Sequence, residues 1–91
     1  MTPETLLAWL EETAEKAGIR VRYEQLDLVD AVVRNGLCTI KGDRVLFVHR
    51  SHPVAEKIRI LAEALKRVDL TGVYLKPAVR DLVDPDDGME G

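Results

Sequence analysis

The sequence predicts one α+β domain over residues 1–83: an N-terminal helix, an antiparallel sheet of three or four strands, a long second helix and a short C-terminal helix. Two observations predict this class. Apolar residues recur at helical steps near both ends of that range and alternate at strand steps in its middle. The length of 91 residues also suits one hydrophobic core. We expect the second helix to pack on one face of the sheet, because that arrangement buries both apolar surfaces.

The N-terminal helix is predicted to begin after Thr2, whose hydroxyl can cap it. Pro3 then lies in the first turn, where a missing amide hydrogen costs nothing. One apolar stripe runs along this helix at steps of four, four and three residues: Leu6, Leu10, Ala14 and Ala17. Gly18 is expected to end the helix as a left-handed cap.

The middle of the chain predicts strands. A half-buried strand is indicated where apolar residues alternate with charged ones: Ile19, Val21 and Tyr23. Residues 25–35 fit either a helical turn or a strand, and their valines favour extended structure toward the end. Two apolar runs, 37–41 and 44–49, flank Gly42-Asp43, which predicts a hairpin.

The second helix is expected to be capped by Ser51 or His52, with Pro53 in its first turn. It should run to about residue 68, because five apolar residues form one core-facing stripe: Val54, Ile58, Leu61, Leu65 and Val68. Ile60 falls off this stripe, so we expect it to contribute to an exposed contact patch.

The end of the chain is predicted to hold one short helix and a tail. Residues 73–75, with Tyr74 at their centre, are expected to return apolar side chains to the core. A third helix is expected from Lys76-Pro77 to about Val83. Residues 84–91 carry four acids and no bases, which is typical of a disordered tail.

Composition excludes several classes of protein. The longest apolar run is five residues, whereas a membrane span needs roughly 20. The N-terminus lacks a basic start followed by an apolar stretch, so we expect a cytoplasmic protein. Cys38 is the only cysteine, which excludes a disulfide within the chain and a four-cysteine zinc site. Scarce Gln and Asn beside abundant Glu, Lys and Arg are a thermophile tendency.

Three residues are candidate metal ligands: Cys38, His49 and His52. One thiolate and two imidazoles could hold zinc with a water as the fourth ligand. Their spacing matches no standard zinc module, and a small buried cysteine and a helix-capping histidine explain the same residues. Ser51 beside His52 resembles a nucleophile with its base, but neighbouring residues rarely face each other, so a capping serine is the favoured interpretation.

Basic residues are concentrated in the middle of the chain. Arg20 and Arg22 fall on one strand face, and with Arg44 they could contact a nucleic-acid backbone. The chain has only four aromatic residues, which leaves no stacking platform for single strands. A solvated sheet face is therefore favoured over a nucleic-acid interface.

Two resemblances add to this interpretation. A group of small bacterial proteins of unknown function is similar to the chain in three segments: Gly36-Leu37-Cys38 with the hairpin after it, Leu61-Ala62-Glu63-Ala64-Leu65, and Asp69-Leu70-Thr71-Gly72-Val73-Tyr74 through Arg80. The order of elements also resembles the zinc-peptidase core of the ImmA/IrrE type, in which a helix bearing HExxH follows a hairpin. Glu56-Lys57-Ile58-Arg59 is similar to the approach to that motif.

In this resemblance the five HExxH positions fall on Ala62-Glu63-Ala64-Leu65-Lys66. Glu63 matches the acid, whereas Ala62 and Lys66 replace the two metal-binding histidines. In such a site the acid acts on a metal-bound water. The resemblance therefore implies a zincin-like scaffold that lacks its metal site.

The leading hypothesis is a non-enzymatic domain that needs no cofactor and acts by contact with a protein partner or with a second copy of itself. Homodimerisation would suit a chain this short, which gains stability from shared burial. Two alternatives stay open: a metal-dependent hydrolase that uses Cys38, His49 and His52, and weak binding of a nucleic-acid backbone by the basic sheet face.

Overall fold

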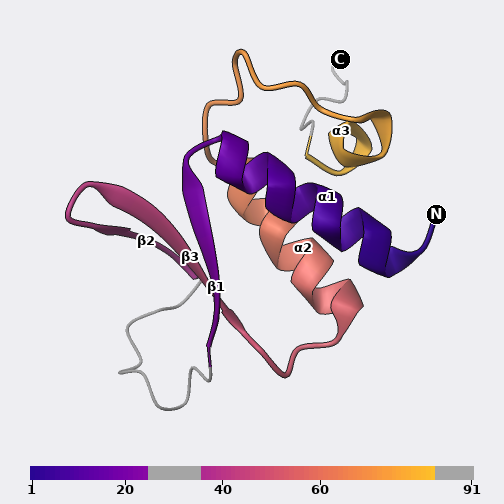
Figure 1. Ribbon diagram of the computed structural model, residues 1–91, viewed down its shortest axis with the longest axis horizontal. Helices are drawn as coiled ribbons and strands as arrows, with labels where there is room; N and C mark the ends of the chain where they lie inside the picture. Colours follow the sequence, from indigo (N-terminus) through magenta and orange to yellow (C-terminus); the bar gives the residue numbers. More distant parts are fainter. Residues whose placement is uncertain (25–35, 84–91) are drawn as a thin grey trace.

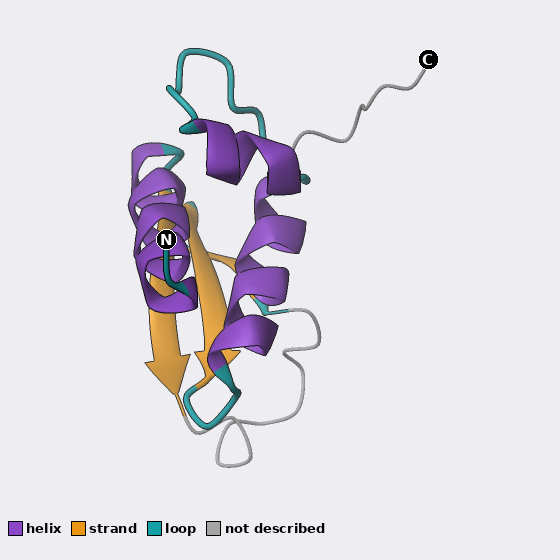
Figure 2. Cartoon of the chain, turned by 90° about the vertical axis from the view of Figure 1, so that its right-hand side faces the viewer, coloured by secondary structure: helices purple, strands orange, loops and turns teal. Residues whose placement is uncertain are grey.

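The helices and strands follow the predicted order along the chain. The computed structural model describes residues 1–24 and 36–83, in which the elements are α1 (Pro3–Lys16), β1 (Ile19–Glu24), β2 (Leu37–Ile40), β3 (Asp43–His49), α2 (Val54–Leu65) and α3 (Pro77–Val83). The α+β class is confirmed. Figure 1 shows α1 and α2 side by side, and Figure 2 shows both in front of the strands. None of these helices is long and apolar enough to cross a membrane.

The first helix forms as its sequence predicts. The Thr2 hydroxyl accepts a hydrogen bond from the Thr5 amide at 3.1 Å, which satisfies one of the free amides of the first turn. Leu10 and Ala14 of the predicted stripe are buried. The helix ends at Lys16, just before Gly18.

The sheet is mixed, with strand order β1-β3-β2, so the prediction of a purely antiparallel sheet is wrong. Strand β1 runs parallel to β3, with Ile19 opposite Arg44 and Glu24 opposite His49, while β2 runs antiparallel to β3. Alternation in β1 indicates which of its side chains are buried, but it carries no information about the direction of the neighbouring strand. That is why the sequence did not reveal the parallel pair.

Strand β3 takes the central position because it is apolar on both faces. Val45 and Leu46 are successive residues, which therefore point to opposite faces, and both are buried. Val48 joins Leu46 on the helix side, where the two lie in one core cluster with residues of both long helices: Leu10, Ala14, Leu61 and Leu65. A strand that is buried on both sides suits the centre of a sheet.

The predicted β2–β3 hairpin is confirmed, with its turn one residue earlier than expected. Lys41 and Gly42 have φ angles of 52° and 87°. Two successive positive φ values are typical of a type I′ turn, whose twist matches that of the flanking strands. The turn therefore ends at Gly42, and Asp43 is the first residue of β3.

The second helix differs from its prediction at both ends. Pro53 is the N-cap and no side chain caps the helix, so the prediction that Ser51 or His52 caps it is wrong. The Ser51 hydroxyl instead lies 2.8 Å from Nδ1 of His49, which removes it from the helix amides. The helix ends at Leu65 rather than near residue 68.

The third helix is confirmed at Pro77–Val83. Tyr74 does not return to the core: 71% of its surface is exposed, whereas its neighbours Val73 and Leu75 are both partly buried. The open choice between strand and helix for residues 25–35 and the predicted tail at 84–91 lie outside the described residues.

Candidate functional site

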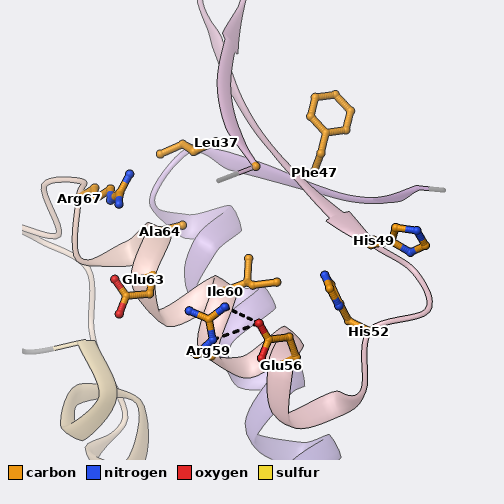
Figure 3. Close-up of a pocket in the computed structure, with 11 residues that line it drawn as sticks. Leu37, Phe47, His49, His52, Glu56, Arg59, Ile60, Glu63, Ala64 and Arg67 are labelled. Carbon is orange, nitrogen blue, oxygen red and sulfur yellow. Dashed lines mark hydrogen bonds and ion pairs between the residues drawn. The ribbon is translucent and has the colours of Figure 1, made fainter. Parts of the chain in front are cut away.

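A groove lies between α2 and the β2–β3 hairpin (Figure 3). It encloses about 380 Å³. We call it the α2 groove and define it by its 11 lining residues: Gly36, Leu37, Phe47, His49, His52, Glu56, Arg59, Ile60, Glu63, Ala64 and Arg67. Ligand sites in proteins commonly enclose about 300–1,000 Å³, so this groove is large enough for a small ligand or a short peptide.

The floor of the α2 groove is apolar. Leu37 contributes from β2, and Ile60 and Ala64 contribute from α2 (Figure 3). Residues four apart on a helix share a face, so Ile60 and Ala64 form a short apolar strip along α2. Figure 3 shows the Phe47 ring on the side of β3 that points away from α2. The half-buried side chains of Leu37 and Ile60 therefore supply most of the apolar contact surface, and Ala64, which is 5% exposed, adds little area between them and the core.

One ion pair occupies the middle of the groove rim. The Arg59 guanidinium donates to Oε2 of Glu56 from Nη2 and, at 3.1 Å, from Nε. This hydrogen bond is the main reason that the pKa of Glu56 is lowered, and the charge of His52 acts in the same direction. The same contact raises the pKa of Arg59. Both side chains are thus held in their charged forms.

A second ion pair neutralises Glu63. Its Oε2 lies 3.6 Å from Nζ of Lys66, which is outside the groove lining. Arg67 lies one residue further along the chain, is exposed, and has no ion pair within residues 1–24 and 36–83. Within the described part of the chain, the rim therefore presents one positive charge without a carboxylate partner, at the end where α2 finishes.

The other end of the groove holds two imidazoles. The ring centroids of His49 and His52 lie 5.7 Å apart, with the ring planes tilted by 60°. The Ser51 amide donates to Nδ1 of His49 at 3.2 Å, so in the neutral ring the proton is on Nε2. The sequence suggested Ser51 as a partner of His52, but Ser51 contacts His49 instead. This contact lies within the turn after β3.

Cys38 does not join the two histidines. It is paired with Val45 on β3, four residues before His49, and a strand advances about 3.3 Å per residue. The structure brings His49 and His52 together but leaves Cys38 on the strand that precedes them. Within residues 1–24 and 36–83, no group of three or more His, Cys, Asp and Glu side chains is arranged to hold a metal ion.

The three candidate arginines do not form one surface. Arg20 and Arg22 are exposed on the same face of β1, as predicted. Arg44 is paired with Ile19, so it points to the opposite face from Arg20. Arg22 also contacts Glu24 at 2.9 Å, which reduces the net positive charge of the strip.

The α2 groove was only partly visible in the sequence. The position of Ile60 off the main stripe of α2 was the one available signal, and the structure places it in the groove lining. Nothing in the sequence indicated that Leu37 and Arg67 line the same groove. One lies in the hairpin and the other after a helix, and only the folded chain brings them to one site. Ala64 gave no signal either, and it lies in the groove lining.

The HExxH comparison places Ala62, Glu63 and Lys66 on α2 and at its end. Ala62 is buried, Glu63 lines the α2 groove, and Lys66 is the ion-pair partner of Glu63. Glu63 lies nine residues after Val54, the first residue of α2, or about 14 Å along the helix axis, and His52 precedes that helix, so the two share a groove without meeting. No protein family, curated protein or solved structure matches the chain. The likeness to the zinc-peptidase core stays a prediction.

Proposed function

We propose that the protein is an interaction domain whose α2 groove binds a short extended segment of a partner protein. The observation that carries this proposal is the groove itself: an apolar floor of about three side chains, bordered by charged side chains along the length of α2. Peptide grooves combine an apolar anchor surface with a polar rim that sets orientation.

The dimensions of the groove support an extended peptide. Helix α2 has 12 residues and is therefore about 18 Å long. An extended chain advances about 3.3 Å per residue, so five or six residues span it. Alternate side chains of such a segment point the same way, and they can contact Leu37, Ile60 and Ala64 in turn.

The test is a selection from a library of random seven-residue peptides displayed on phage. Wild-type protein is expected to enrich peptides that lose binding to an Ile60→Glu variant, because a buried charge on the groove floor removes the apolar contact. The matched control is Ile40→Glu. Ile40 is an apolar residue that is 45% exposed and lies outside the groove.

Both variants are first compared by circular dichroism and thermal unfolding to confirm that they fold. Peptides that bind wild type and Ile40→Glu but fail on Ile60→Glu support the proposal. Enriched peptides that bind all three proteins equally contradict it, as does a selection with no enrichment above the starting library.

A further inference from the structure

We infer that the partner segment carries a carboxylate that binds Arg67, followed by apolar residues at alternate positions. This inference rests on the proposed function of the α2 groove, and it adds the chemistry and the register of the ligand.

The charges along the rim are distributed unevenly. Glu56 is held by Arg59, and Glu63 is held by Lys66 at 3.6 Å. Both acids of the groove are therefore compensated by cations of this chain. Arg67 is the rim cation for which the described residues supply no carboxylate.

Arg67 has the chemistry to select a carboxylate. Guanidinium groups present a planar fork that can donate two parallel hydrogen bonds to one carboxylate. Figure 3 shows the Arg67 side chain at the Leu37 side of the groove, beside Ala64. A carboxylate bound to Arg67 lies at the edge of the apolar floor. The rest of the peptide that carries this carboxylate can then extend along the floor.

The spacing within the groove sets the register. Arg67 and Ile60 are seven residues apart, which is about 10 Å along a helix axis, or about three residues of extended chain. Apolar side chains at the second and fourth positions from the acid would lie on either side of Ile60. The expected ligand is therefore acid-x-apolar-x-apolar, in either chain direction.

The inference is tested by a change of charge at Arg67. The same peptide library is selected on wild type, on Arg67→Glu and, as a matched control, on Arg80→Glu, which changes an exposed arginine of α3 outside the groove. Wild type and Arg80→Glu are expected to enrich Asp or Glu two residues from the first apolar position. Arg67→Glu is expected to enrich Lys or Arg there.

Individual peptides then give the magnitude. Replacing the selected acid by its amide is expected to weaken binding to wild type by about fivefold, as for an exposed ion pair, and to leave binding to Arg67→Ala unchanged. A fivefold loss that persists in Arg67→Ala would overturn the inference, because the acid would then contact another group.

The outcomes separate the two proposals. If the selected peptides still depend on Ile60 but show no acid preference that reverses with Arg67→Glu, the carboxylate inference is wrong and the groove proposal stands. If no selected peptide depends on Ile60, both are wrong.

Discussion

The imidazole of His49 shows how one residue can take a local structural role in place of a chemical one. The Ser51 amide donates to its Nδ1 at 3.2 Å, and the Ser51 hydroxyl oxygen lies 2.8 Å from the same nitrogen. Both contacts come from Ser51, two residues along the chain, so they hold the ring against the turn after β3. These contacts give both residues a structural role in the turn after β3.

Tyr23 connects three elements, and its ionisation predicts a pH effect. Its hydroxyl donates to Oε2 of Glu11 on α1, while Nζ of Lys57 on α2 lies 5.1 Å from the ring centroid. Burial, and then the hydrogen bond to the Glu11 carboxylate, raise the pKa of Tyr23 above its ordinary value of 10.0. The folded protein therefore holds the phenol proton more tightly than the unfolded chain does.

The sign of the effect follows from this shift. Below about pH 10 the Tyr23 phenol keeps its proton in both the folded and the unfolded protein, so its hydrogen bond to Glu11 stabilises the fold fully. Above about pH 10 the phenol ionises first in the unfolded chain, so the free energy of unfolding falls. Tyr23→Phe is expected to lower the free energy of unfolding by about 1 kcal/mol at pH 7. The variant should also lose less stability than wild type between pH 9 and about 11 in urea denaturation.

Tyr74→Phe is the matched control, because 71% of Tyr74 is exposed. It is expected to unfold like wild type at every pH. An equal loss of stability at high pH in wild type and in Tyr23→Phe would show that Tyr23 does not cause the alkaline effect.

At the scale of elements, the hairpin depends on two glycines that differ in their surroundings. Gly36 and Gly42 both have a φ of 87°. A Cβ on Gly36 would lie 2.5 Å from the Phe47 carbonyl oxygen and 3.0 Å from Cδ1 of Leu46, whereas a Cβ on Gly42 would meet nothing within 4 Å. The first glycine is therefore required by close approach as well as by conformation.

Alanine substitutions separate these two causes. Gly42→Ala is expected to cost about 1 kcal/mol, the strain of a left-handed alanine. Gly36→Ala is expected to cost about 3 kcal/mol, because the strand must also shift. Equal losses for the two variants in urea denaturation would contradict the close packing of Gly36 against β3.

The elements also show how far the sequence predicted the fold. Helix α1, the hairpin and α3 were predicted because their signals are local: a capping threonine, a turn between apolar runs, and a proline at a helix start. The direction of β1 and the cap of α2 were predicted wrongly. A parallel pair forms between distant segments, and Ser51 could bind a helix amide or His49 with equal local chemistry.

At the scale of the molecule, α2 has two roles on two faces. Its inward residues Leu61 and Leu65 are fully buried in the core, whereas Ile60 is half-buried in the groove lining, and Ala64, which is 5% exposed, belongs to both. The core stripe was predictable because it repeats at helical steps. The groove was not, because its lining comes from β2, from β3, from the length of α2 and from the turns beside them.

This division predicts unequal costs for neighbouring substitutions. Leu61→Ala is expected to lower the free energy of unfolding by about 3 kcal/mol, since it leaves a cavity beside α1 and the sheet. Ile60→Ala, at a half-buried position, is expected to cost about 1 kcal/mol and to weaken peptide binding. Chemical denaturation measures the first effect, and fluorescence anisotropy of a selected peptide measures the second. Equal stability losses for the two variants would place Ile60 in the core.

The most direct test of the groove is a two-dimensional ¹H–¹⁵N NMR titration of the wild-type protein with a selected acid-bearing peptide. The account predicts that the largest amide shifts fall on groove residues of two separate segments: Leu37, Ile60, Ala64 and Arg67. Amides on the outer face of the sheet, such as those of Arg20 and Ile40, should stay in place. Shifts that centre on the outer sheet face, or none at saturating peptide, would contradict it.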